Sequence, residues 1–218
     1  MEAHRQSAER SRRRGEGPRL ALEKGRSDTD ITHVFVQTYI YELPFGNNKR
    51  WAKSGVSRAV LGGWQLNGIF TSQTGPPLKL SYSATSLNAP GYSNQPNLVG
   101  TGKPEIFGNV GPGQLWFDTG RFLAPTPGTI GNVGRNILTG PGLVNIDLSI
   151  FRKFRIREGM TLEVRGESFN FTNTPHFDKP GTTLGNPNFG QVTASNDFTD
   201  STQDTDNRKV QIGIRLFF

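Results

Sequence analysis

Three charged side chains at alternate positions of one segment are the first candidates for chemistry. Glu163, Arg165 and Glu167 share a face if residues 161–171 form a strand, because successive side chains of a strand point to opposite sides. Two carboxylates of this row, or Asp147 with Glu163 across a hairpin, could act as acid and base. Since Arg165 lies in the same row and no nucleophile–base pair accompanies it, we interpret the row as charge-compensated lining of a watery space. We therefore expect no enzymatic activity.

Metal and phosphate sites have weaker support. His33 and His176 lie in different segments without a third ligand at suitable spacing, and His4 lies near the N-terminus. The chain has no cysteine, which excludes disulfides, thiolate metal sites and a cysteine nucleophile. The glycine-containing stretches 111–113 and 131–135 do not open a helix after a strand, as a phosphate-binding loop would. We expect neither a metal nor a cofactor.

A group of aromatic residues allows three interpretations. Tyr39, Tyr41, Phe45 and Trp64 could stack on a ligand, pack among themselves, or form a girdle at a membrane–water interface. Such girdles flank the apolar band of outer-membrane barrels. We favour the girdle, with plain packing as the main alternative.

The positive charge is concentrated at the N-terminus. Residues 1–26 hold eight of the 25 Lys and Arg but only four of the 18 Asp and Glu. They lack apolar periodicity, so we expect a disordered or marginally helical arm, or a non-native reading frame. A nucleic-acid-binding role would rest on this arm alone, and we do not expect it. No apolar run is long enough for a transmembrane helix, and no secretory signal peptide is recognisable.

Two-residue periodicity predicts strands over most of the remaining apolar segments. Alternating apolar and polar residues, with turn residues between the segments, are typical of half-exposed strands. We expect about six strands, at residues 33–43, 63–73, 78–82, 144–154, 161–171 and 209–218. Most of them have the length of about 9–11 residues that a tilted strand needs to cross a bilayer. The fold class is therefore predicted to be all-β, an antiparallel up-and-down segment of a transmembrane barrel.

The faces of these strands predict which residues meet lipid. The final strand has one uninterrupted apolar row, consisting of Val210, Ile212, Ile214, Leu216 and Phe218. Charges in contact with lipid would cost roughly 2–4 kcal/mol for each Arg or Lys at the bilayer midplane. We therefore expect the polar rows to face the lumen, namely Glu163, Arg165, Glu167, Lys209, Gln211 and Arg215.

The connections between the expected strands alternate in length. Long connections are expected at residues 44–62, 83–142 and 172–208, and short ones at 74–77 and 155–160. Outer-membrane barrels have short periplasmic turns and long extracellular loops. With the C-terminus in the periplasm, all three long connections would be extracellular. An open sheet edge in lipid leaves backbone groups unpaired, so we expect six strands to need further neighbours.

From about Ser27 onward the chain resembles the C-terminal barrel segment of Oar-like TonB-dependent receptors. Each motif that carries the resemblance is short, but their order along the chain is fairly specific. The motifs are Asp30-Ile31-Thr32-His33, Tyr39-Ile40-Tyr41-Glu42-Leu43-Pro44-Phe45-Gly46, Leu61-Gly62-Gly63-Trp64-Gln65-Leu66-Asn67-Gly68, Gly131-Asn132-Val133-Gly134-Arg135-Asn136, Phe169-Asn170-Phe171-Thr172-Asn173-Thr174-Pro175-His176-Phe177 and the terminal aromatic strand.

This resemblance implies a plugged barrel of about 22 strands in the bacterial outer membrane, importing a ligand with energy from an inner-membrane complex. It implies that the terminal strand, Val210 to Phe218, is the signal that the barrel-assembly machinery recognises. The family's plug, carboxypeptidase-regulatory-like domain, TonB-contacting segment and signal peptide have no counterpart here. We therefore expect residues 27–218 to be a fragment, with outer-membrane lipid, the other strands, the plug and, through the plug part, the TonB complex as partners.

A soluble β-sandwich that binds a ligand such as a carbohydrate is the alternative. It would need two sheets with inward apolar faces, and shorter strands. The two hypotheses differ in solubility, because a barrel segment needs detergent and a sandwich does not.

Overall fold

A computed structural model describes residues 22–83, 94–195 and 207–218. The chain divides into two compact units. The sheet unit comprises His33–Thr74, Gly142–His176 and Ser195–Phe218, and the loop unit comprises Met1–Thr32, Gly75–Pro141 and Phe177–Ala194. Within the described ranges, no helix has the length and apolar character needed to span a membrane. Most of the predicted arm, residues 1–21, lies outside the described residues.

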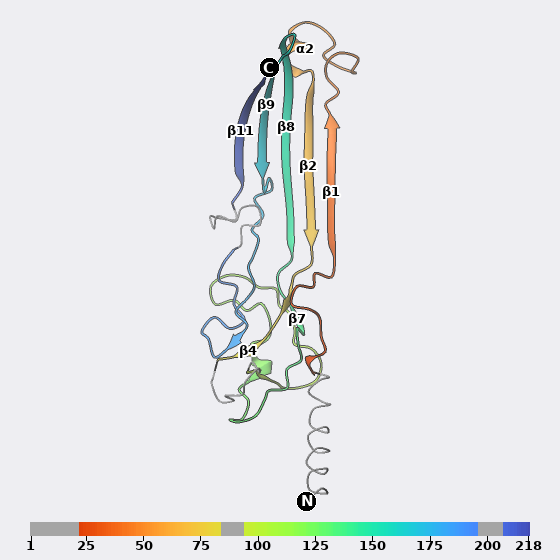
Figure 1. The fold of residues 1–218 in the computed structure, drawn as a ribbon. Helices are drawn as coiled ribbons and strands as arrows, with labels where there is room; N and C mark the ends of the chain where they lie inside the picture. Colours follow the sequence, from red (N-terminus) through yellow and green to blue (C-terminus); the bar gives the residue numbers. More distant parts are fainter. Residues whose placement is uncertain (1–21, 84–93, 196–206) are drawn as a thin grey trace, which may run out of the picture. The chain divides into compact units, whose positions relative to one another are not determined.

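The sheet unit contains one five-stranded antiparallel sheet (Figure 1). Its strands lie in the order in which they occur in the chain, and each pairs with the next. They are β1 (Val34–Glu42), β2 (Trp64–Gln73), β8 (Leu143–Arg157), β9 (Met160–Phe169) and β11 (Lys209–Phe217). This up-and-down arrangement confirms the predicted all-β, antiparallel fold class.

The predicted strand at residues 78–82 does not belong to this sheet. Thr74–Pro77 is therefore not a hairpin turn. The strand that pairs with β2 is β8, and residues 74–142 form the connection between these two strands. The expected six strands become five in the described part of the chain. Residues 77–82 instead supply β3 (Pro77–Leu78) and β4 (Ser81–Tyr82) to the loop unit.

The connections are therefore distributed differently from the prediction. The β8–β9 turn, the β1–β2 connection and the C-terminus lie at the same end of the sheet (Figure 1). The β2–β8 and β9–β11 connections lie at the other end. The long connection at residues 44–62 thus shares an end with the tightest turn, contrary to the expectation that all long connections lie together. It contains a short helix, α2 (Gly55–Leu61).

The tight turn between β8 and β9 follows from its sequence. Glu158 and Gly159 separate the two strands, and Gly159 has φ +78°. This left-handed conformation is strained for residues with a Cβ atom and free of that penalty for glycine. The turn fixes the register in which Lys153 lies opposite Glu163.

The loop unit has a hydrophobic core of its own. The buried side chains that form this core are Leu78, Leu80, Phe117, Phe122, Val133 and Leu138. Three phenylalanine rings pack edge to face, with centroids 5.4–5.9 Å apart, namely Phe117, Phe122 and Phe189. Short paired strands surround them: β3 with β7 (Leu138–Thr139), β4 with β10 (Thr183–Leu184), and β5 (Asn97–Leu98) with β6 (Phe122–Leu123), which follows a 3-10 turn, η1 (Thr119–Arg121). Residues 75–141 of the β2–β8 connection and residues 177–194 of the β9–β11 connection therefore pack together in one compact unit.

Candidate functional site

One face of the five-stranded sheet carries a network of charged side chains. Arg165 lies at the centre of β9, where its Nη2 is 3.2 Å from Oε1 of Glu163 and its Nη1 is 3.2 Å from Oε1 of Glu167. Lys153 on β8 contributes a second cation, with Nζ 3.8 Å from Oε2 of Glu163. Glu163 is only 5% exposed, so these cations offset much of the cost of removing its carboxylate from water.

The register of β11 extends this network by one strand. Arg215 lies directly opposite Glu163, and Gln211 lies opposite Glu167 and donates from Nε2 to its Oε2. Lys209 lies opposite Phe169 on the same face. All six residues that were predicted to face the lumen therefore share one side of the sheet, hereafter the polar face.

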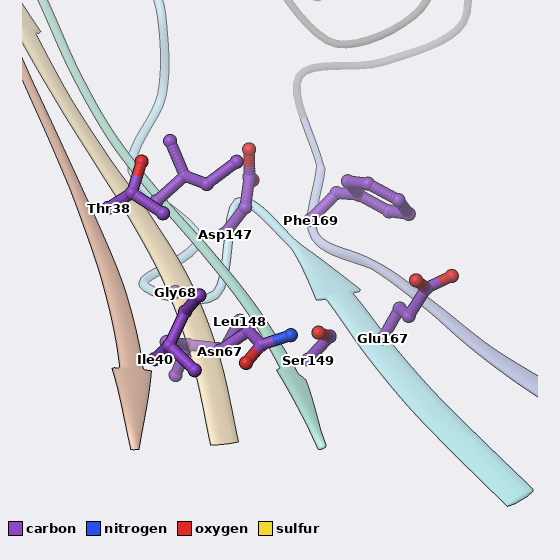
Figure 2. A pocket seen from close by; sticks show the side chains of 10 residues that line it. Thr38, Ile40, Asn67, Gly68, Asp147, Leu148, Ser149, Glu167 and Phe169 are labelled. Carbon is purple, nitrogen blue, oxygen red and sulfur yellow. The ribbon is translucent and has the colours of Figure 1, made fainter. Parts of the chain in front are cut away.

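A hollow of about 270 Å³ lies farther along the polar face (Figure 2). Residues of four strands, β1, β2, β8 and β9, contribute to its lining. The lining residues are Thr38, Ile40, Asn67, Gly68, Ile69, Asp147, Leu148, Ser149, Glu167 and Phe169. The mixture of amide, hydroxyl, carboxylate and apolar groups could contact a partly polar ligand.

One row of directly opposed residues runs through the hollow. Gln211, Glu167, Ser149, Asn67 and Ile40 follow one another from β11 to β1. Residues opposed in neighbouring strands lie on the same face and are close enough to interact. The row therefore joins the charged network on β9 and β11 to the hollow on the central strands.

Asp147 is held by the turn that ends β9. Its Oδ1 accepts hydrogen bonds from Nδ2 of Asn145 at 3.0 Å and from the backbone N of Asn170 at 2.9 Å. Asn170 has φ +45° and closes the turn with two hydrogen bonds of 2.9 Å to the backbone of Thr174. Asparagine tolerates this left-handed conformation better than most residues do. The turn thus places Phe169 and Asp147 beside the hollow.

The two histidines considered as metal ligands have structural contacts. His176 is 4% exposed, and its Nε2 lies 3.1 Å from the backbone oxygen of Val144. The backbone of His33 exchanges hydrogen bonds with Thr74 beside the start of β1. In the parts of the chain that the structure describes, no group of three or more His, Asp or Glu side chains could hold a metal ion.

The opposite side of the sheet, hereafter the apolar face, carries the predicted apolar row of β11. Val210, Ile212, Ile214 and Leu216 lie opposite residues of β9 that include Val164 and Leu162, and they are 48–79% exposed. Phe218, which is 97% exposed, follows the last residue of β11. A row of this kind needs an apolar environment, because exposed apolar patches of this length are unusual in soluble monomers.

Three of the four aromatics that were interpreted as a girdle lie on this apolar face. The register places Tyr39 opposite Gly68, Tyr41 opposite Leu66, and Trp64 opposite Arg152. Phe45 lies just beyond β1 and packs on Trp51, with ring centroids 5.8 Å apart. Arg152 is a charged residue on this face, and its guanidinium lies 4.2 Å from the centroid of the Phe154 ring.

The residues that line the hollow were only partly predicted. Glu167 and Asp147 were singled out by charge, and Asn67 belongs to one motif of the family resemblance, whereas Thr38 and Ser149 belong to no motif. Their alternation with apolar residues was the available signal, since it places them on the polar side of their strands. These residues lie close to one another because of the register between different strands, and the sequence of a single strand does not determine this register.

Comparisons with known proteins agree with this geometry. The outer membrane beta barrel domain family matches residues 4–211. No curated protein and no solved structure matches the chain. A single up-and-down antiparallel sheet with one polar and one apolar face fits this family and not a sandwich, since the other sheets of the described residues have two strands of two residues each. The chain belongs to the outer membrane beta barrel domain family and is a protein of the bacterial outer membrane.

Proposed function

We propose that this protein forms part of the wall of a TonB-dependent transporter or receptor, with its polar face lining the lumen. The observation that carries the proposal is the hollow on the polar face, lined from four neighbouring strands. In outer-membrane barrels the polar side of the wall faces the interior and the apolar side faces lipid. Ligand uptake would then pass the row that joins Gln211, Glu167 and Asn67.

The charges support this orientation of the sheet. Lys153, Arg165 and Arg215 lie on the polar face, and lipid contact would cost roughly 2–4 kcal/mol for each of them near the midplane. On the apolar face, the two rows of opposed residues that include Ile212 and Ile214 contain one Lys or Arg, namely Arg152. This residue lies close to the end of the sheet. Reversing the sheet would therefore place several charges in lipid and a row of Ile, Val and Leu in water.

Three motifs of the TonB-dependent resemblance, at residues 39–46, 61–68 and 169–177, include ends of strands of the wall. Gly46 and Gly62 approach so closely that a Cβ atom on either would lie 3.0 Å from the Cα of the other. The 169–177 motif contains the Asn170 turn that ends β9. These three motifs therefore help to build the wall, which supports a likeness in architecture to these receptors. Energised transport is the function that we propose from this likeness.

We further propose that the protein has no catalytic role and that the barrel-assembly machinery recognises its terminal strand. Other barrel strands and a plug would be its partners at the sheet edges. In the described residues, β1 and β11 each have one neighbour in the sheet, so each offers an unpaired edge. Such an edge cannot remain exposed in lipid, because its backbone groups would lack hydrogen-bond partners.

Uptake in intact cells tests the transport proposal. Cells with and without the gene would receive a panel of labelled ferric chelates, peptides and oligosaccharides, before and after treatment with an uncoupler. We expect at least one solute to accumulate only in cells with the gene, and this accumulation to stop when the proton gradient collapses. Equal accumulation in both strains would contradict transport, and gene-dependent uptake that survives the uncoupler would contradict coupling to TonB.

A further inference from the structure

The β1–β2 connection presents cations and exposed apolar side chains together. Residues 49–61 contain four Lys or Arg and no Asp or Glu. In the same segment Trp51 is 49% exposed, and Val56, Val60 and Leu61 on or beside the helical turns of α2 are 79%, 58% and 47% exposed. No residue of α2 is buried. A segment with both features has the chemistry of a surface that binds anionic lipid.

Two residues of the apolar face fix the end of α2. The backbone oxygen of Val60 accepts a hydrogen bond from Nε1 of Trp64 at 3.0 Å and another from Nη1 of Arg152 at 2.9 Å. Trp64 and Arg152 lie opposite each other on the apolar face. The helix is therefore attached at the border between that face and the end of the sheet, which is the level of the membrane–water interface if the apolar face meets lipid.

The neighbouring turn adds charge of the same sign. Arg155 and Arg157 end β8 at this end of the sheet, beside Ile156, which is 56% exposed. Glu158 and Glu42 are the acidic residues near them, and Glu42 is paired with Lys49 at 2.6 Å. Arg50, Lys53 and Arg58 are all exposed, so a strongly cationic surface remains at this end.

We propose that residues 49–61 form an interfacial anchor that binds the anionic headgroups of phospholipids, with the apolar side chains of α2 inserted among the acyl chains. Charge complementarity and continuity with the apolar face select a phospholipid surface over an acidic protein, which would not need Val56 and Val60. The inference rests on the proposed orientation of the sheet but is independent of transport.

Site-directed nitroxide labels on the full chain test this anchor, because the protein has no native cysteine. Val56→Cys reports on α2, Ile212→Cys on the apolar face, and Leu123→Cys on an exposed apolar position of the loop unit. The protein is reconstituted in phosphatidylcholine vesicles with and without phosphatidylglycerol. Collision with oxygen, which partitions into lipid, is compared with collision with a water-soluble nickel complex.

We expect the oxygen-to-nickel collision ratio at Val56 to rise several-fold when phosphatidylglycerol is present, and to fall in high salt as screening shortens the range of the charges. The variant Arg50→Glu/Lys53→Glu/Arg58→Glu should abolish the rise, and the corresponding glutamine variant should reduce it. The matched control, Lys24→Glu/Lys103→Glu/Lys179→Glu, changes the net charge equally at exposed positions of the loop unit and should preserve it. Leu123 should not respond.

A Val56 label that stays accessible to nickel in both lipids, while Ile212 contacts lipid, would overturn the anchor and leave the orientation of the sheet intact. Labels at both positions accessible to nickel would overturn both. A lipid-accessible Val56 that is insensitive to phosphatidylglycerol and to charge reversal would overturn recognition of anionic headgroups.

Discussion

The Nη2 atom of Arg165 lies 3.2 Å from Oε1 of Glu163, a carboxylate that is almost completely buried although it lies on the polar face of the sheet. Neighbouring side chains shield it from water on a side where a barrel would be wet. Arg165 also binds Glu167, and its guanidinium lies 5.6 Å from the centroid of the Phe151 ring. Arg165 is therefore held in one orientation by two carboxylates and a ring.

Replacing Arg165 by methionine should destabilise the sheet. Of its two ion pairs, Glu163 would keep only the longer one, to Lys153. An insufficiently paired buried carboxylate costs about 2–3 kcal/mol, somewhat less than the loss of a sole partner. Urea unfolding of the full chain in detergent measures the change. Lys153→Met, which removes the more exposed partner, is the control and should cost less. The double variant Glu163→Leu/Arg165→Met should recover stability, and if it is worse than Arg165→Met the pairing argument fails.

Adjacent residues of β8 should differ in their contact with water. Ser149 lies in the row through the hollow and Ile150 lies on the apolar face. In outer-membrane vesicles, Ser149→Cys should react several-fold faster than Ile150→Cys with a water-soluble maleimide, because the reactive thiolate does not form readily in lipid. Denaturation should make the two rates equal. The same rate at both positions in native vesicles, or the reverse order, would exclude a lumen on the polar face.

The sheet could be predicted from the sequence because its information is local. The strands β2, β8, β9 and β11 are recognisable from alternation and β1 from its β-branched and aromatic residues. The observed bounds of all five differ from the predicted ones by at most three residues. The segment around Leu78 alternates as well, but it pairs with Leu138 in the loop unit. Alternation predicts a strand but does not identify the strand with which it pairs. The segment around Leu78 was therefore counted as a sixth strand of the sheet. For the same reason the 44–62 connection was assigned to the wrong end of the sheet.

The candidate site was predictable only in part, for a related reason. Glu163, Arg165 and Glu167 share a face in any strand that contains them. That Gln211 donates to Glu167, or that Asn67 and Ser149 line the same hollow, depends on pairing between segments far apart in the chain. The packing of the loop unit could not be predicted from local sequence patterns either, since Phe117, Phe122 and Phe189 come from two different connections.

The loop unit should open when its aromatic core is truncated. Phe117 is fully buried, and its ring packs edge to face on Phe122 and Phe189. Phe117→Ala should cost about 3–5 kcal/mol, because the cavity cannot be refilled by the rigid neighbouring rings. Limited proteolysis should then cleave within residues 94–141 while the β-sheet signal in circular dichroism persists. Leu123→Ala, at an exposed position, is the control. Unchanged protection in Phe117→Ala would contradict an independent core.

An acid-sensitive contact is predicted in the loop unit at Asp28. The hydrogen bond from Nδ2 of Asn136, 2.7 Å long, and the nearby Arg135 hold the pKa of the Asp28 carboxyl below its usual range, against a smaller opposing effect of desolvation. A depressed pKa in the folded state means that the contact stabilises the fold above the unfolded-state pKa. This contribution is lost as the pH falls through the folded-state pKa.

Asn136→Ala should therefore raise the pKa of Asp28 toward its ordinary value. Carbon-13 chemical shifts of the carboxyl group, followed through an acid titration, measure this directly. Glu105→Gln, outside this contact, is the control and should leave the Asp28 titration unchanged. A titration of Asp28 that is identical in Asn136→Ala and the wild type would exclude the hydrogen bond as the main cause.

The terminal residue should matter for assembly and not for stability. Phe218 follows β11, is 97% exposed and is not part of the hydrophobic core of the loop unit, so its removal takes little apolar surface out of a protein environment. If the assembly machinery reads the terminal aromatic strand, Phe218→Ala should sharply reduce the heat-modifiable, membrane-inserted fraction in cells. The purified variant should nevertheless unfold in urea at the wild-type concentration. Phe217→Ala is the matched control, because Phe217 lies on the other side of β11, opposite Thr161. Equal loss of insertion in both variants would indicate a general need for apolar residues at the C-terminus, and wild-type insertion of Phe218→Ala would refute recognition of this residue.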